Sequence, residues 1–236
     1  MTSLHSENVL SESIQAILHA QLNGHSRANN GQITCQPYKV ALDEISNGQK
    51  KSHWIWYVWP SFSIVRSNVG NHARKFLLST FTDVLQLVSH PVLSVHLLQI
   101  TTVATNHLRQ GVTPTTLFGK SHKYDAPKFI EGCMCYATAC VITENNSSLR
   151  VYLSALNAMR DSGENKRYKL SLCNTKSALL RIKNTTITNA VNQLTTKYLL
   201  SDIHYEEGEI KDMNDDQKTS GKKRHPLEKF YELLNF

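Results

Sequence analysis

The chain has 236 residues and a mass of 26.7 kDa, with 40% apolar residues, 19% charged residues and a net charge of +7. A chain of this length can bury roughly 70–75% of the surface that it exposes when unfolded, so we expect one domain with extensions. The composition excludes collagen, a coiled-coil rod and a wholly disordered chain. No stretch approaches the roughly 20 apolar residues that a membrane span needs.

Apolar residues recur at helical spacing along most of the chain, which predicts an all-α, compact multihelical fold. The first expected helix covers residues 11–23, and the second begins at Pro37 and stops at Gly48. The later helices are expected at residues 72–88, 91–109, 114–118, 129–142, 148–160, 174–182 and 187–200.

The helical domain is expected to span residues 14–182, after an extension over residues 1–13 and with an inserted loop at 24–35. An additional helical segment over 183–204 and a disordered linker over 205–225 would follow, because the linker is highly charged and has little to bury. Residues 226–236 form an amphipathic pattern. This last helix either docks on the body or binds a protein partner.

Positive charge is concentrated in residues 1–201, which hold 20 basic and 10 acidic side chains, whereas residues 202–236 hold 6 and 9. Such a body is either simply solvated or attractive to an anionic small molecule. A nucleic-acid partner is not supported, because no aromatic–basic signature of the RNA-binding kind is present. The N-terminus lacks a secretory pattern and the five cysteines are odd in number, which indicates reduced thiols in the cytoplasm or nucleus.

One segment stands out, because all three tryptophans lie within residues 50–60, KKSHWIWYVWP. The spacing fits neither a regular helix nor a strand, and Pro60 disfavours a helical conformation at Trp59. We therefore expect an extended or irregular segment that crosses the core. The indole rings either pack as core or line a pocket.

In the pocket interpretation, this segment binds a nucleotide-like ligand of the ADP-ribose or NAD class. The residues that would stack on the ligand or hold its phosphate are Lys50, Lys51, His53, Trp54, Trp56, Trp59 and Lys128. The candidates for proton transfer are His53, Asp125 and Glu131. Two of these have structural alternatives: His53 also suits a hydrogen-bonded residue that holds a loop, and Asp125 suits a helix N-cap followed by Pro127.

The cysteines at 133, 135 and 140 are interpreted as buried free thiols. A metal site is not predicted, because zinc sites favour cysteines separated by two to four residues and usually need a second such pair. No phosphate-binding loop, dinucleotide-binding or nucleophile motif is present, and no cofactor is implied.

The run KSHWIWYVWP resembles the Lys-Ser-His-Trp-Met-Trp-Phe-Ile-Phe-Pro hallmark of domain of unknown function family 1810. Other segments resemble that family in the same order along the chain, namely Tyr38 with residues 41–45, and residues 48–50, 89–93, 117–119 and 125–129. The resemblance covers about residues 14–182 and implies a compact, mainly α-helical domain without an established activity.

The chain differs from the usual sequence of this family in two segments. Residues 131–136, EGCMCY, stand where the family usually has Ser-Ser-Met-Thr-Leu-Phe, and the residues from Ile64 to Ser67 replace a Gly-Leu-Gly stretch. If the serines contact a ligand in the family, that contact is changed here. The sequence thus favours a non-catalytic binding or interaction module, with an enzyme or sensor for a nucleotide-like ligand as the alternative.

Overall fold

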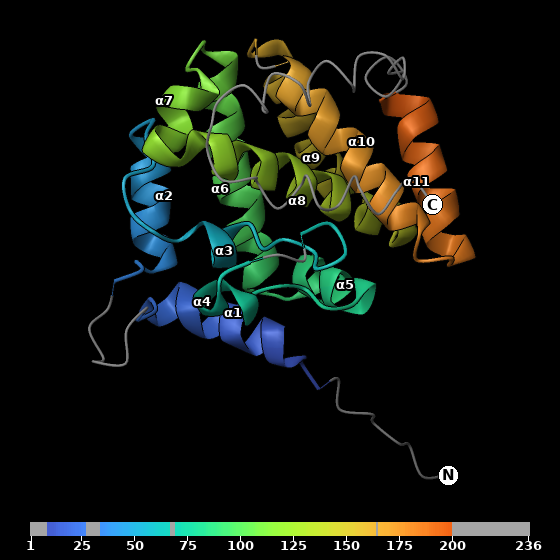
Figure 1. Ribbon diagram of the computed structural model, residues 1–236, viewed down its shortest axis with the longest axis horizontal. Helices are drawn as coiled ribbons and strands as arrows, with labels where there is room; N and C mark the ends of the chain where they lie inside the picture. The colour runs from blue at the N-terminus through green and yellow to red at the C-terminus, as the bar shows by residue number, and fades with distance from the viewer. Residues whose placement is uncertain (1–8, 27–33, 67–68, 164, 200–236) are drawn as a thin grey trace, which may run out of the picture.

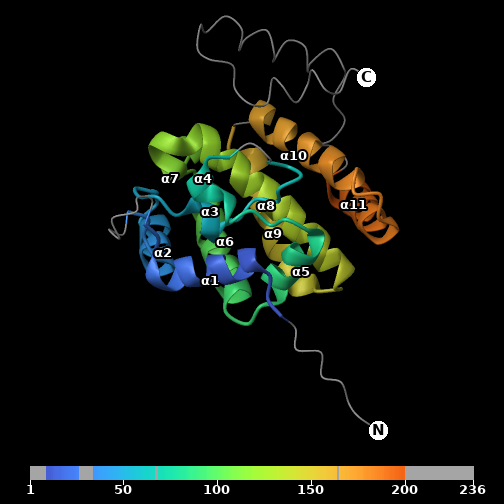
Figure 2. The same cartoon turned by 60° about the horizontal axis from the view of Figure 1, so that its bottom comes forward.

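The computed structural model describes residues 9–26, 34–66, 69–163 and 165–199. Within these residues it confirms the all-α prediction, with the helices packed into one compact body (Figures 1 and 2). The helices are α1 (Glu12–Asn23), α2 (Tyr38–Ser46), α3 (Ile55–Val58), α4 (Asn71–Arg74), α5 (Phe81–Ser89), α6 (Leu93–Arg109), α7 (Pro114–Phe118), the 3-10 turn η1 (Gly119–Ser121), α8 (His122–Ile142), α9 (Asn146–Asp161), α10 (Asn165–Leu180) and α11 (Thr185–Tyr198).

Some of the expected segments lie outside the described residues. These are the first part of the N-terminal extension, most of the inserted loop, the linker at 205–225 and the amphipathic helix at 226–236. Among the helices that are described, none alone has the length and apolar composition to cross a membrane, and α5 and α6 reach them only as a pair bent by 82°.

Helix α8 is the element around which the fold is built. It packs against α5, α7, α9, α10 and α11, and it crosses the middle of the body in Figures 1 and 2. Every residue from 128 to 140 is buried, so the helix has no solvent-facing side over this stretch. A helix that is buried on all sides belongs in the interior of a domain, and its charged residues therefore need partners there.

The single helix predicted over residues 72–88 is wrong, because the structure divides it into α4 and α5. Thr80 begins α5 with a capping box: its hydroxyl accepts from the Asp83 backbone N–H at 3.2 Å, and the Asp83 carboxylate accepts from the Thr80 N–H at 3.0 Å. These reciprocal bonds satisfy N–H groups that a helix start leaves unpaired. Apolar residues keep their helical spacing across the break at Thr80, so the sequence pattern does not reveal that two helices are present.

Two other helix starts also differ from expectation. Helix α8 begins at His122 rather than near residue 129, and α10 begins at Asn165 rather than near Asn174. The first turns of both helices are polar, so apolar periodicity alone does not reveal them. The Thr175 hydroxyl lies inside α10, where it donates to the Ser171 carbonyl at 2.7 Å instead of capping the helix.

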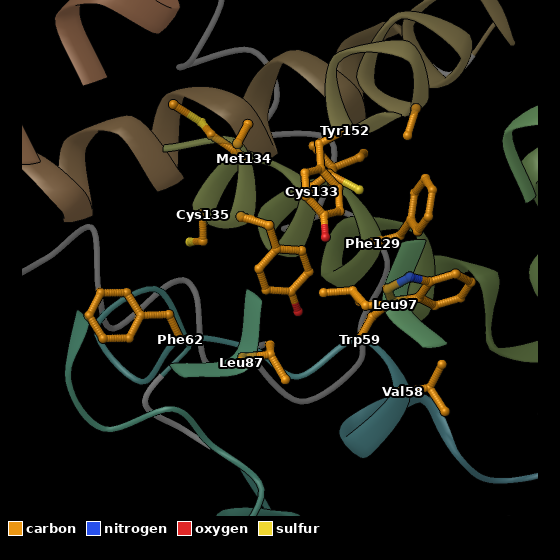
Figure 3. Close-up of a cluster of buried hydrophobic side chains, with 14 of the residues drawn as sticks. Val58, Trp59, Phe62, Leu87, Leu97, Phe129, Cys133, Met134, Cys135 and Tyr152 are labelled. Carbon is orange, nitrogen blue, oxygen red and sulfur yellow. The ribbon is translucent and has the colours of Figure 1, made fainter. Parts of the chain in front are cut away.

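The Trp-rich segment crosses the core, as predicted, but it is not wholly extended. Residues Ile55–Val58 form the single turn α3, and Trp59 leaves the helical conformation with φ −120° and ψ 76°. The Trp59 ring meets Phe129 of α8 edge-to-face with centroids 4.8 Å apart, and both side chains are fully buried (Figure 3). Contacts of this kind fasten the segment to the central helix.

Gly119 provides a test of how closely α7 approaches the Trp-rich segment. Its φ is +61°, and a Cβ at this position would lie 2.6 Å from the Lys50 carbonyl oxygen. We expect Gly119→Ala to lower the free energy of unfolding by about 2–4 kcal/mol, because backbone strain and overlap add together. Chemical denaturation would measure the loss.

Gly111→Ala is the matched control for this substitution. Gly111 has φ +88°, but nothing lies within 4 Å of its added Cβ, so this variant carries backbone strain alone. Its expected loss is about 1–2 kcal/mol. Equal losses in the two variants would contradict a close approach of Lys50 to Gly119.

Candidate functional site

Glu44 of α2 holds the beginning of the Trp-rich segment in place. Its Oε2 accepts hydrogen bonds from the backbone N–H groups of Lys51 at 2.7 Å and Ser52 at 3.0 Å, and from Trp54 Nε1 at 2.8 Å. Burial acts to raise the pKa of Glu44, but hydrogen bonds from Ser52, Lys51 and Trp54 outweigh it and hold the pKa below its usual value. The carboxylate thus acts as a fixed anchor for residues 51–54.

The three tryptophans have different environments. Trp54 and Trp59 are buried, and each indole N–H has an acceptor: Glu44 for Trp54, and the Thr101 hydroxyl at 2.9 Å for Trp59. Trp56 is only partly buried, and its ring packs against the small apolar cluster of Val69, Ala73 and Leu77. Only the Trp56 indole therefore keeps surface that a ligand could touch.

A buried ionic cluster lies beside these rings. The Asp125 cluster, as we call the side chains of Lys50, Asp125 and Lys128, contains two ammonium groups and one carboxylate. Lys50 Nζ lies 3.0 Å from Asp125 Oδ2, and Lys128 Nζ donates to Asp125 Oδ1 at 3.0 Å. The three side chains are each 5% exposed or less. The pair at Oδ2 lacks hydrogen-bond geometry, so this oxygen accepts no hydrogen bond in the structure.

The fold explains why these three residues meet. Asp125 and Lys128 are three residues apart on α8 and thus share a face of the helix. Lys50 is brought to them because its backbone N–H donates to the Leu117 carbonyl at the end of α7, 2.7 Å away, while its carbonyl oxygen lies against Gly119. Segments distant in sequence are therefore fixed against one another by backbone contacts.

The Lys128 ammonium is the most unusual group in the cluster. It lies 3.7 Å from the centroid of the Trp56 ring, whereas the Lys50 ammonium lies 5.4 Å from that of Trp54. Burial lowers the pKa of Lys128 to about 8, and the positive charges of Arg66 and Lys50 add to this effect, although Asp125 opposes it. A lysine in this setting releases its proton more than two pH units below an ordinary lysine.

A second ion pair borders the cluster. Arg66 holds Glu131 in a two-pronged contact, with Nε to Oε2 at 2.9 Å and Nη2 to Oε1 at 2.8 Å. The Arg66 and Glu131 side chains are 16% and 10% exposed, so this pair lies nearer to the surface than Asp125. Counted together, the two groups hold three basic and two acidic side chains, which leaves one positive charge in excess.

The structure separates the candidate residues into two groups. Lys50, Trp54, Trp59, Asp125, Lys128 and Glu131 are buried and Trp56 is partly buried, whereas Lys51 and His53 are exposed. The backbone carbonyl of His53 accepts from Gln36 N–H at 3.2 Å and from the Tyr57 hydroxyl at 3.1 Å. These contacts belong to the His53 backbone, so the role expected for its imidazole stays a prediction.

The N-cap alternative for Asp125 is wrong. The N-cap of α8 is Ser121, and Asp125 and Pro127 lie within the helix. Because α8 begins before Asp125, the carboxylate is free of the capping role and points to the two lysines instead. The sequence did not lead us to place Glu44 or Arg66 in this region. For Glu44, the available indication was its position in the segment at 41–45 that resembles the family.

The buried positions predicted for Cys133, Cys135 and Cys140 are confirmed. Burial raises the pKa of the first two thiols well above the usual range, and raises that of Cys140 to about 12. These sulfurs are protonated near neutral pH, whereas metal binding and nucleophilic attack both require the thiolate. Among the described residues, no group of three or more His, Cys, Asp or Glu side chains is placed to hold a metal ion.

The helices and the segments that meet at the Asp125 cluster form a small all-α domain. A family model described as "Protein of unknown function (DUF1810)" matches residues 19–172. The chain belongs to this family. The segments at 48–50, 50–60, 117–119 and 125–129, which carry the resemblance in sequence, are those that contact one another here.

A solved structure shares the fold. The crystal structure of the conserved hypothetical protein Rv1873 from Mycobacterium tuberculosis matches with a TM-score of 0.50 and 18% sequence identity. The match covers 67% of this chain and 95% of that protein. No curated protein matches the sequence.

Glu44→Gln tests the anchoring of the Trp-rich segment. The folded pKa of Glu44 is lowered, so its stabilising contribution is fully present above the ordinary pKa near ~4.3 and is lost as the pH falls through the folded value. We expect the free energy of unfolding of the unaltered protein to fall on acidification more steeply than that of the variant. Chemical denaturation at pH values from 3 to 7, in steps of about one pH unit, would measure how steeply the free energy of unfolding of each protein changes with pH.

The control for this variant is Asp43→Asn, on the same helix and with an exposed side chain. It removes a carboxylate that does not hold the segment, so its acid slope should match that of the unaltered protein. A Glu44→Gln protein with an unchanged slope would show that the carboxylate is not the anchor.

A second pair of variants tests the excess of positive charge. Asp125→Asn leaves two buried ammonium groups without a carboxylate and should lower the free energy of unfolding by about 3–5 kcal/mol. Lys128→Met leaves Lys50 and Asp125 paired one to one, so the loss should be less than about 1 kcal/mol. Chemical denaturation at neutral pH gives both values. Equal damage by the two substitutions would contradict the charge excess.

The pH dependence of the free energy of unfolding tests the lowered pKa of Lys128 independently. The folded chain releases its proton near pH 8, whereas the unfolded chain keeps it up to about pH 10.4. The unfolded state therefore binds more protons in this window, and the contribution of Lys128 makes stability rise with pH. We expect Lys128→Met to remove this rise.

Proposed function

We propose that this protein is a non-catalytic binding domain that recognises a small planar anion, of the nucleotide-like class, at Trp56 and the Asp125 cluster. The observation that carries this proposal is the presence of two buried ammonium groups that share one carboxylate. A ligand phosphate would supply the missing negative charge. The proposal combines the binding-module interpretation of the sequence with its expected ligand chemistry.

The energetic argument rests on the burial of the cluster. Removing an ammonium group from water costs several kcal/mol, and this cost is offset only by paired charges and hydrogen bonds. Among the described residues, Asp125 is the carboxylate in ion-pair contact with Lys50 and Lys128, and its single negative charge does not balance both. An unbalanced charge that lowers stability is a common property of binding sites, where stability and function conflict.

The position of Trp56 supports the planar part of the proposed ligand. Its indole is partly exposed, and its ring centroid lies 3.7 Å from the Lys128 ammonium, so an aromatic ring and a cation lie side by side. Nucleotides combine a flat base with phosphate and would use both. Trp54 and Trp59 would act indirectly, since their buried indoles fix the segment that carries Trp56.

The arrangement of acids and bases favours binding over catalysis. Both oxygens of Asp125 lie 3.0 Å from ammonium groups, and both oxygens of Glu131 contact Arg66. The His53 side chain is exposed, in contrast to the buried carboxylate of Asp125. Both carboxylates proposed for proton transfer are thus already paired with cations, which supports binding over catalysis.

Calorimetric titration with AMP, NAD and ADP-ribose tests the proposal, with adenosine as the ligand that lacks phosphate. We expect the phosphate-bearing compounds to bind and adenosine to bind at least about tenfold more weakly, because charge-assisted hydrogen bonds contribute about 1.5–3 kcal/mol. Affinity should fall as salt is added.

Variants locate the site. Lys128→Met should weaken binding by roughly tenfold or more, whereas Lys51→Met removes an exposed lysine of the same segment and should leave the affinity unchanged. Absence of heat and of any thermal shift with all three phosphate compounds would overturn the proposal. Conversion of NAD or ADP-ribose during the titration, detected by chromatography, would overturn its non-catalytic part.

A further inference from the structure

The Lys128 side chain has the properties of a reactive amine as well as those of a phosphate ligand. Its Nζ lies 3.0 Å from a carboxylate oxygen, 3.7 Å from the centroid of an indole ring and close to two other cations. Lysines that form covalent bonds with carbonyl compounds are typically desolvated or next to another cationic group, because both conditions favour the neutral amine. Lys128 satisfies both conditions.

The proportion of neutral amine follows from these surroundings. With a pKa of about 8, about a quarter of the Lys128 side chains are neutral at pH 7.5, compared with about one in a thousand for an ordinary lysine. The exposed Lys51, in the same segment as Trp56, serves as the comparison residue for labelling within the same chain. The Lys128 ammonium lies over the partly buried Trp56 ring, 3.7 Å from its centroid.

We propose that Lys128 forms an imine with an anionic aldehyde or ketone that is held by Trp56 and the neighbouring cations. The inference rests on the proposed function, which supplies the binding of the anion, and it adds a covalent step and a narrower ligand class. The ligand class is a planar or phosphate-bearing carbonyl compound.

The step needs no oxidant or reductant. The lone pair of the neutral Nζ attacks the carbonyl carbon, so that a C–N bond forms while the C=O π pair moves to oxygen. The nitrogen loses a proton to Asp125 Oδ1, its hydrogen-bond partner at 3.0 Å, and Asp125 passes this proton to the alkoxide oxygen. The nitrogen lone pair then forms the C=N bond while the C–O bond breaks, and the departing hydroxide takes the remaining proton of the nitrogen, so that one water molecule is released for each imine formed. Lys50 Nζ stays 3.0 Å from Asp125 Oδ2 throughout.

Pyridoxal 5′-phosphate is a suitable probe, because it combines a flat ring, a phosphate and an aldehyde. The full-length protein is incubated with the probe near pH 8, reduced with borohydride to fix the imine as a secondary amine, and digested for mass spectrometry. We expect Lys128 to carry at least tenfold more label than Lys51. Lys128→Arg, which keeps the charge, should remove this label and leave that of Lys51 unchanged.

Two comparison compounds distinguish the covalent step from the binding that it requires. Pyridoxine 5′-phosphate lacks the aldehyde, so it should bind and protect Lys128 from the probe. Pyridoxal lacks the phosphate and should label Lys128 at least tenfold more slowly.

Binding of pyridoxine 5′-phosphate without labelling at Lys128, or labelling spread evenly over the exposed lysines, would overturn the imine and leave the proposed function intact. Equal labelling by pyridoxal and its phosphate, without protection, would support a reactive amine and overturn the recognition of an anion.

Discussion

The contact of Asp125 with two buried ammonium groups is the constraint on which the arrangement of this domain depends. Lys50 and Lys128 come from segments far apart in sequence, and a single buried carboxylate contacts both. Buried ion pairs contribute little net stability even when their charges balance, and here they do not balance. The fold around them must therefore be stable enough to tolerate the excess charge, and the all-round burial of α8 provides this stability.

The three tryptophan rings of the Trp-rich segment make different contacts, and through them the segment connects the core to the Asp125 cluster. Trp59 packs against Phe129 and binds Thr101, Trp54 is held by Glu44, and Trp56 is left partly exposed beside Lys128. A single helical turn between Trp54 and Trp59 leaves these two rings in contact, with centroids 5.7 Å apart, whereas the Trp56 ring packs against Val69, Ala73 and Leu77. The two buried indoles fix its path, so the position of Trp56 relative to the lysine is set by the core and not by a flexible loop.

The sequence predicted the fold class and most of the helices, because apolar periodicity reports burial directly. It failed where burial and helix boundaries do not coincide: the period runs through the Thr80 cap that separates α4 from α5, and the polar first turns of α8 and α10 conceal their starts. The candidate site was predicted only as a set of residue types. That Asp125 faces Lys50 depends on the close approach of α7 to residue 50, a tertiary contact that no local pattern encodes.

Two segments that were expected to differ from the family lie together in the structure. Arg66 comes from one segment and Glu131 from the other, and their side chains bind each other through two contacts. Because the pair is neutral as a whole, it leaves the charge excess at Lys50 and Lys128 unchanged while it adds a guanidinium near Lys128. The pair thus lies at the border of the Asp125 cluster, where its side chains are more exposed than that of Asp125.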